Sequence, residues 1–475
     1  MPMANKFYIT AAIPYVNAKP HIGHALEFVQ TDTIARYHKL LGKDTLSLSG
    51  GDENAVKNVQ AAEEEGVPIQ EFVDRNTEAF HKLAIALNAE FGVWQKGSDK
   101  THHYSSVQKL WKLCEKDIYK KTYEGLYCVG CEAFYTPDEL DENGECFEHP
   151  GKELEKVAEE NYFFKLSKYQ DQLIKLVESD ELKIVPETRK NEVLAFLKEP
   201  LQDISISRTN DRAKNWGVPV PGDPNQKIYV WFDALNIYQS GIGFGWDEEK
   251  YNKYWPADVH VIGKGITRFH AIYWPAFLLS AKLKLPKALF IHGYLTVNGQ
   301  KISKTLGNVI DPFGIIEKYG ADALRYYLLA KVSPFADGDF SEEKLKETHN
   351  ADLANGIGNL VARVAKLCEK DDSRFDESIH RSLNKDVEKH IQEFRIDRAL
   401  ESIWQKVSEL DKYINDKKPW EQTGENLKKT LEYSVSAIRS ITYCLVPFLP
   451  ETAEKIERQF AGPKIKSASP LFPRL

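Results

Sequence analysis

The chain carries two short motifs whose residue types suit the binding of a phosphate-bearing ligand. The first runs His21-Ile-Gly-His24 and the second runs Lys301-Ile-Ser-Lys-Thr305. A glycine lets a ligand approach the backbone closely, and imidazole groups can donate hydrogen bonds to phosphate oxygens. Two ammonium groups on a loop suit the negative charge that develops on a departing pyrophosphate. Alone, the first motif is as typical of a capped helix start, and the second is more typical of a solvated basic loop. The pair in this order favours a nucleotide site.

The elements expected around these motifs are those of a nucleotide-binding α/β fold. A β-type run over 7–12 precedes the first motif, and a helical pattern follows it as far as Gly42. A second predicted strand, 45–49, leads into Asp52, at a strand end where open α/β sheets bind ligands. A long helical stretch is then expected to about Leu113. Further strands are predicted over 228–232, 259–262 and 288–292, and Asn298-Gly299 predicts a hairpin turn. From about 350 onward, apolar residues at spacings of three and four predict a helix bundle.

Three cysteines and a histidine have the spacing of a metal knuckle. Cys128-x2-Cys131 is followed, after 14 residues, by Cys146-x2-His149. Three thiolates and one imidazole make a closed tetrahedral set, which suits a structural zinc ion rather than a catalytic one. The alternative is a coincidence of spacing.

The composition bounds the class of protein. At 475 residues the chain is expected to form two to four domains, and 42% hydrophobic and 28% charged residues are ordinary for a globular protein. There is no apolar run of membrane-spanning length, and residues 1–6 lack the features of a signal peptide, so we expect a cytoplasmic location. A net charge of −7 argues against indiscriminate nucleic-acid binding. An RNA partner would need a local basic face.

Four longer blocks of the sequence resemble those of a known family. Residues 11–24 (AAIPYVNAKPHIGH), 229–235 (YVWFDAL), 269–276 (FHAIYWPA) and 299–308 (GQKISKTLGN) resemble methionyl-tRNA synthetases, a family of class I aminoacyl-tRNA synthetases. The resemblance spans essentially the whole chain. It implies a methionine–tRNA ligase that forms methionyl-adenylate and pyrophosphate from L-methionine and ATP with Mg²⁺, and then charges tRNA(Met).

The resemblance also implies the residues of the active site. The ATP-binding residues would be His21, Gly23, His24, Glu27, Gly263, Lys264, Lys301 and Lys304, of which His21, His24, Lys301 and Lys304 would be catalytic. The methionine-binding residues would be Ile13, Tyr15, Asp52, Trp231, Leu235, Tyr238, His270 and Trp274. Asp52 would hold the ammonium group, as a carboxylate at a strand end can; the alternative is a loop-capping aspartate. Aromatic residues suit a thioether, and Tyr15 and His270 would offer it polar contacts; the alternative is that these are core aromatics.

The helical region would read the tRNA anticodon. Asn359, Arg363 and Trp420 match the family's anticodon contacts, and splayed bases stack on aromatic and arginine planes; a buried Trp and a surface Arg are the alternative. The implied division is a Rossmann-type catalytic domain (1–115 and 229–294) split by a connective insertion with the zinc knuckle (116–228), a linker domain with the lysine loop (295–350) and a helical anticodon-binding domain (351–475).

The chain departs from the family pattern at several positions. Asn54 stands where a histidine is usual, and Gly265 where an aspartate is common, so no role is transferred to either. No appended tRNA-binding module follows the helical region, and we therefore expect a monomer. A synthetase for another apolar amino acid, a small nucleotidyltransferase and a non-catalytic RNA-binding relative are the alternative functions. The larger editing insertion of the valine, isoleucine and leucine enzymes argues against the first of these.

Overall fold

The computed structural model describes residues 6–128, 133–135, 140–147, 151–302, 307–371, 373–376 and 383–475. The chain forms two compact units. The first comprises Met1–Pro20, Lys43–Lys82 and Glu90–His292, and the second comprises His21–Gly42, Leu83–Ala89 and Gly293–Leu475.

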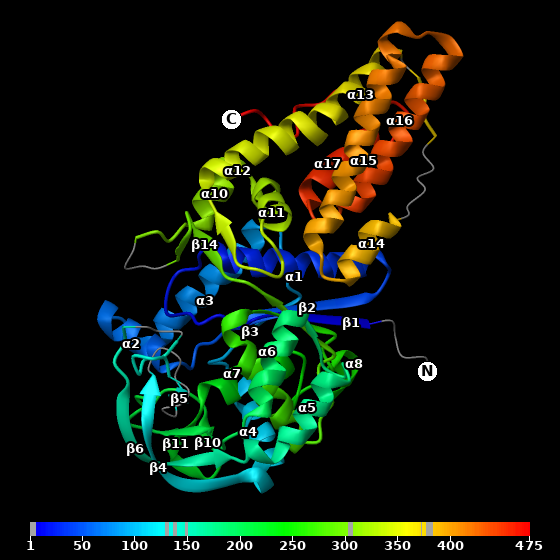
Figure 1. Cartoon of the computed structure of the whole chain (residues 1–475). Coiled ribbons are helices and arrows are strands. Elements are labelled where there is room, and N and C mark those ends of the chain that lie inside the picture. Colours follow the sequence, from blue (N-terminus) through cyan, green and yellow to red (C-terminus); the bar gives the residue numbers. More distant parts are fainter. Residues whose placement is uncertain are drawn as a thin grey trace. The chain divides into compact units, whose positions relative to one another are not determined.

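A six-stranded parallel sheet organises the first unit (Figure 1). Its strands, in spatial order, are β3 (Val93–Lys96), β2 (Asp44–Gly51), β1 (Lys6–Ala11), β12 (Val259–Gly263), β13 (Ala288–His292) and β7 (Lys183–Val185). Every neighbouring pair is parallel. The order reverses between β1 and β12, and ligands bind outside the carboxyl ends of strands at such a switch point. The Rossmann-like sheet expected from the sequence is confirmed.

The first unit also contains helices. They are α2 (Val56–Glu65), most of α3 (Ile69–Ala86), α4 (His103–Cys114), α5 (Gln170–Glu178), α6 (Glu187–Lys198), α7 (Val230–Ser240), α8 (Glu248–Tyr254) and α9 (Trp274–Ser280). One π-helical turn, Phe269–Tyr273, precedes α9. Every residue of α7 is buried, so this helix is a central part of the core.

Two sequence expectations for this unit were wrong. Residues 228–232 were expected to form a strand, but β11 (Asp223–Ile228) ends where that run begins, and α7 starts at Val230. A short apolar run that is buried on all sides has no periodicity that separates a helix from a strand. The stretch up to Leu113 was expected to be helical throughout, yet it contains β3, whose four residues are too short to interrupt a helical pattern.

The segment between the two halves of the sheet forms two small antiparallel sheets. One has the order β5 (Ala133–Tyr135), β4 (Ile118–Cys128), β6 (Glu155–Phe164) and β8 (Ile204–Ser205), and the other has the order β10 (Pro219–Val220), β11 and β9 (Ser207–Thr209). The same segment also supplies β7, which pairs with β13 at the edge of the parallel sheet. No sequence pattern predicted this contribution.

The second unit is mostly helical. It contains α1 (Ile22–Leu40), α10 (Pro312–Tyr319), α11 (Ala321–Ala330), α12 (Glu342–Thr348), α13 (Asn359–Asp371), α14 (Lys385–Gln392), α15 (Ile396–Lys417), α16 (Gly424–Leu445) and α17 (Pro450–Phe460), and a sheet of order β15 (Gln300–Lys301), β14 (Leu295–Val297) and β16 (Gly338–Phe340). Figure 1 shows α13, α15, α16 and α17 running alongside one another. The helix bundle is confirmed, and so is the hairpin turn, with φ of 51° at Asn298 and 76° at Gly299.

A buried ion pair ties α1 to the rest of this unit. The Arg325 guanidinium lies 2.8 Å from Asp32 of α1, and both side chains are at most 1% exposed. Arg325 also donates to the carbonyls of Leu87, Pro447 and Phe448. Removing one partner of such a pair leaves an uncompensated buried charge, which typically costs about 3–5 kcal/mol. Arg325 therefore ties α11 to α1 and to the segment between α16 and α17.

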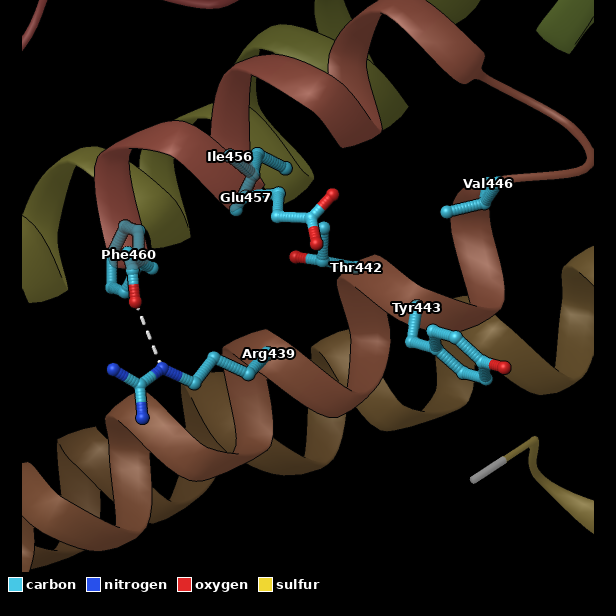
Figure 2. Close-up of a pocket in the computed structure, with 7 residues that line it drawn as sticks. All are labelled: Arg439, Thr442, Tyr443, Val446, Ile456, Glu457 and Phe460. Carbon is cyan, nitrogen blue, oxygen red and sulfur yellow. Dashed lines mark hydrogen bonds between the residues drawn. The ribbon is translucent and has the colours of Figure 1, made fainter. Parts of the chain in front are cut away.

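Helices α16 and α17 leave a small hollow between them (Figure 2). Its volume is about 30 Å³, far below the roughly 300–1,000 Å³ of typical ligand pockets. On its rim, Arg439 Nε donates to the Phe460 carbonyl at 2.8 Å. The hollow is thus a packing gap rather than a ligand site. No helix within the described ranges is long and apolar enough to cross a membrane.

Candidate active site

The predicted methionine-binding residues all lie in the first unit. Ile13 and Tyr15 follow β1, Asp52 follows β2, three residues lie on α7, His270 lies on the π-helical turn and Trp274 begins α9. The α7 residues are Trp231, Leu235 and Tyr238. Trp231, Leu235, Tyr238 and Trp274 belong to the main hydrophobic core, and Ile13 and Tyr15 pack against it. The fold therefore brings residues from four separate segments to one region.

Aromatic rings form one wall of this region. Tyr15 meets Trp231 edge to face, with ring centroids 6.0 Å apart and an interplanar angle of 87°. The Trp231 ring stacks on that of Phe269, with centroids 3.7 Å apart and an interplanar angle of 4°. The centroid of the Trp231 ring lies 6.3 Å from that of the His270 ring. Such contacts fix ring orientations beyond what burial alone does.

Both nitrogens of His270 have protein partners. Nδ1 lies 3.0 Å from the Ile266 carbonyl and Nε2 lies 2.8 Å from the Tyr238 hydroxyl. A carbonyl only accepts, so Nδ1 carries the proton and Nε2 accepts from Tyr238. Burial lowers the pKa of His270 to about 4, and the ring is neutral near pH 7. Both ring nitrogens of His270 are therefore already engaged by protein groups.

Asp52 is held by its backbone at the carboxyl edge of the sheet. Its N–H donates to the Pro14 carbonyl at 2.9 Å, and it forms a parallel bridge with Tyr15. Its carbonyl accepts from Asn58 Nδ2 at 2.8 Å. The side chain is buried beside Glu53, whose carboxylate accepts from Thr77 and Ser98. The Asp52 position is thus fixed on both sides.

His21 and His24 form a reciprocal cap at the start of α1. His21 Nδ1 accepts from the Gly23 N–H at 3.1 Å, and His24 Nδ1 accepts from the His21 N–H at 3.1 Å. The ring protons therefore lie on Nε2. Burial lowers the pKa of His21 to about 4 and that of His24 well below its usual range, so both rings are neutral donors near pH 7. A Cβ on Gly23 would stand 3.0 Å from the His21 ring, which explains the glycine.

The other predicted nucleotide residues occupy several elements. Gly263 ends β12 and Lys264 begins a 3-10 turn, both next to the switch point of the parallel sheet. Glu27 lies on α1, one turn beyond the His motif. Lys301 is in β15, but its side chain lies outside the described part, as do Ser303, Lys304 and Thr305.

Two of the four predicted metal ligands are described. Cys128 ends β4, and Cys128 and Cys146 are both buried. Between them, the Asp141 carboxylate accepts from the backbone of Asn143 and Glu145 in a tight turn. Cys131 and His149 lie outside the described residues, and within the described ranges no group of three or more potential ligands occurs.

The predicted anticodon residues share one face of the second unit. Arg363, on α13, donates to Asp411 at 3.0 Å and to Asn415 at 2.5 Å, both on α15. Its guanidinium lies 5.1 Å above the ring of Trp420, which is 48% exposed. Asn359, one helical turn before Arg363, is also exposed. The alternative of a buried Trp420 is therefore wrong.

Comparison with known proteins identifies the family. A family model described as class I tRNA synthetases (M) matches residues 7–365, and one described as the anticodon-binding domain of tRNA ligases matches 377–473. A methionine–tRNA ligase of Thermotoga maritima is 42% identical over 96% of this chain and 75% of its own length. The methionine–tRNA ligase of Brucella suis biovar 1 is 40% identical over 99% of this chain and 98% of its own length. The chain belongs to the methionine–tRNA ligases.

Solved structures of methionine–tRNA ligases share the fold. The Mycobacterium tuberculosis methionyl-tRNA synthetase in complex with methionyl-adenylate superposes with a TM-score of 0.91 at 37% identity, over 99% of this chain and 100% of that one. The apo form of the same protein superposes with a TM-score of 0.85 at 34% identity, over 99% of this chain and 98% of that one. The parallel sheet and the helical C-terminal part are thus those of a methionine–tRNA ligase.

Two features of the site were not predicted from the sequence. Phe269, the stacking partner of Trp231, adjoins His270 in the sequence, and that proximity was the available signal. The buried carboxylate of Glu53 follows Asp52 directly, but its donors come from α3 and from the loop after β3. Contacts of that kind depend on the tertiary fold and leave no trace in local spacing.

Proposed function

We propose that the chain activates L-methionine with ATP at the carboxyl edge of the parallel sheet and then charges tRNA(Met). In the first step a methionine carboxylate oxygen attacks the α-phosphorus, and the bond to pyrophosphate breaks. In the second step a hydroxyl of the terminal ribose attacks the methionyl carbonyl, and AMP leaves. The substrate supplies its own nucleophile, so the protein's task is positioning and charge stabilisation.

The methionine half of the proposal rests on Asp52 beside the aromatic wall. The buried carboxylate of Asp52 would pair with the substrate ammonium group. Trp231, Tyr15 and the carbon edge of His270 would surround the thioether, for which sulfur–aromatic contacts are favourable. Among the described residues, the buried indole N–H of Trp231 has no hydrogen-bond partner, which leaves one donor for a substrate atom. Ile13, Leu235, Tyr238 and Trp274 would complete the pocket.

For ATP, the roles of the residues follow from their charge and hydrogen bonding. The neutral rings of His21 and His24 would donate from Nε2 to phosphate oxygens, next to the amides at the start of α1. Lys301 and Lys304 would stabilise the charge of the leaving pyrophosphate. Glu27, Gly23, Gly263 and Lys264 would lie around the nucleotide. Mg²⁺ would arrive bound to ATP, and we assign it no protein ligand.

Zinc would have a structural role in the connective segment. The thiols of Cys128 and Cys146 are buried and flank a tight turn, and they would serve as two of four tetrahedral ligands. Cys128, Cys131, Cys146 and His149 would hold the ion, whose binding would contribute folding free energy. Metal analysis should find one zinc per chain, and Cys146→Ser should abolish it.

The helical part would bind the anticodon. Arg363 is oriented by Asp411 and Asn415 and lies over an exposed indole, which is a platform on which bases stack. Asn359 would add hydrogen bonds. We also propose the domain limits expected from the sequence, with β7 as the one strand that 116–228 returns to the catalytic sheet. A cytoplasmic location and a monomer stay predictions.

Amino-acid-dependent ATP–pyrophosphate exchange tests the proposal. Exchange should require methionine, and methionine should then be transferred to tRNA(Met). Exchange supported by leucine or valine but not by methionine would overturn it.

A further inference from the structure

Asn54 lies at the centre of a buried hydrogen-bond network next to the proposed methionine site. Its Nδ2 donates to Asp233 Oδ2 at 2.7 Å and to the Gly97 carbonyl at 2.7 Å. Its Oδ1 accepts from the Tyr104 hydroxyl at 3.3 Å. Asn54 is buried, and both of its amide hydrogens and its carbonyl are therefore used.

The network continues from Asp233 into α4. Asp233 Oδ1 lies 2.5 Å from His103 Nε2, and His103 Nδ1 lies 2.7 Å from the Ser240 hydroxyl. Asp233 and His103 are at most 2% exposed, and no solvent competes for these contacts. Asp233 stands in the first turn of α7, where a carboxylate is favoured by the helix dipole. The chain of bonds thus links the end of β2, the end of β3, α4 and the start of α7.

The two ends of this hydrogen-bond network adjoin residues that would bind methionine. Asp52 stands two residues before Asn54, and Trp231 stands two residues before Asp233. The backbone around Asn54 is also tightly packed, because a Cβ on Gly97 would lie 3.0 Å from the Gly51 carbonyl and 3.1 Å from the Glu53 nitrogen. A shift of Asn54 would consequently move β2 and α7 relative to each other.

We propose that Asn54 is a positioning residue that sets the separation between Asp52 and Trp231, and hence the placement of the methionine carboxylate. The inference rests on the proposed methionine site and adds a residue to which the family pattern gives no role here. A neutral amide suits this position because it gives one hydrogen to a carboxylate and one to a carbonyl. An aspartate would face Asp233 with like charge and Gly97 with a second acceptor. Misplacement of a reacting group by about 1 Å can cost about a hundredfold in rate.

Pyrophosphate exchange on Asn54→Ala and on the equally sized Asn54→Asp tests this role. We expect kcat/KM for methionine to fall by about ten- to a hundredfold in Asn54→Ala and further in Asn54→Asp, with KM for ATP within about twofold. The matched control is Asn161→Ala. Asn161 is a fully buried asparagine in β6 that donates to Glu159 at 3.0 Å. It should lower the melting temperature without changing KM for methionine.

The outcomes separate the two claims. Asp52→Asn is measured in parallel, and unchanged methionine kinetics in that variant would overturn the proposed site itself. If Asp52→Asn is impaired but folded Asn54→Ala and Asn54→Asp bind methionine as the wild type does, only the positioning role fails. It also fails if Asn54→Ala impairs the kinetic constants for methionine and for ATP by the same factor. If Asn54→Ala does not fold, the isosteric Asn54→Asp decides by the same criteria.

Discussion

The proposed methionine site and the proposed anticodon surface are built in opposite ways. At the proposed methionine site, Asp52, Trp231 and His270 are 3%, 7% and 1% exposed and contact other protein groups. On the anticodon face, Trp420 is 48% exposed and Arg363 is held by two polar side chains of α15. A small apolar substrate is recognised by enclosing it, whereas unstacked bases need an open platform. The first region must therefore be part of the core, and the second need not be.

This difference predicts how substitutions behave. In the methionine region the same side chains support both stability and binding, so the two properties should change together. On the anticodon face a substitution should change the tRNA step alone.

The largest effect is expected for Trp231→Ala. It removes a core indole that stacks on Phe269 at 3.7 Å, and such truncations cost about 3–5 kcal/mol. The free energy of unfolding from urea titration should fall by that amount, and methionine-dependent exchange should fall at least a hundredfold. Unchanged stability would show that the wall is not part of the core.

A pH effect on stability should follow from the buried histidines. The pKa of His270 and His21 is lowered by burial to about 4 in the folded chain, against about 6.5 when unfolded. The unfolded chain then binds more protons between these values, so stability is full above pH 6.5 and is lost as the pH falls towards 4. We expect each ring to contribute about 2 kcal/mol to the loss by pH 4.5. Urea titrations at pH 7 and 4.5 should show a smaller pH difference in His270→Gln, and an equal difference would contradict the assignment.

Trp420→Ala should separate the two regions. Loss of a base-stacking surface costs about 1–3 kcal/mol, so kcat/KM for tRNA should fall about ten- to a hundredfold. Methionine-dependent exchange and the melting temperature should stay as in the wild type. Tyr433→Ala, at an exposed aromatic residue of α16, is the control and should leave charging unchanged. If Trp420→Ala also lost methionine-dependent exchange, the two regions would not act separately.

The smallest effect is expected for Asp411→Asn. This change weakens one exposed partner of Arg363, at 3.0 Å, and exposed ion pairs contribute about 0–1 kcal/mol. Charging should weaken less than about fivefold, and the loss should shrink further at high salt. A larger loss would mean that Asp411 itself contacts the RNA.

Much of this contrast can be predicted from the sequence, because local pattern and family blocks reach the same residues. The runs that form β1, β2, β12 and β13 have strand character, and their ends place Asp52 and Gly263 at the carboxyl edge of the sheet. The helix α7 was missed because an all-buried apolar run lacks periodicity, and β7 because three residues carry no pattern of their own.

The hydrogen bonds within the site could not be predicted from the sequence. The partners of Asn54 come from residues 97, 104 and 233, which only the fold brings together. The tautomer of His270 depends on the Ile266 carbonyl and the Tyr238 hydroxyl. The family resemblance, not local spacing, named the residues of the aromatic wall, and the contacts that orient them come from the fold.

Pyrophosphate exchange and tRNA charging, measured side by side on Asp52→Asn and Trp420→Ala, test the central claim most directly. We predict that Asp52→Asn loses both activities by a similar factor, because both need methionine bound in the first unit. Trp420→Ala should lose charging alone. If Asp52→Asn kept methionine-dependent exchange, or if both variants lost both activities equally, the assignment of methionine to one region and of the anticodon to the other would be contradicted.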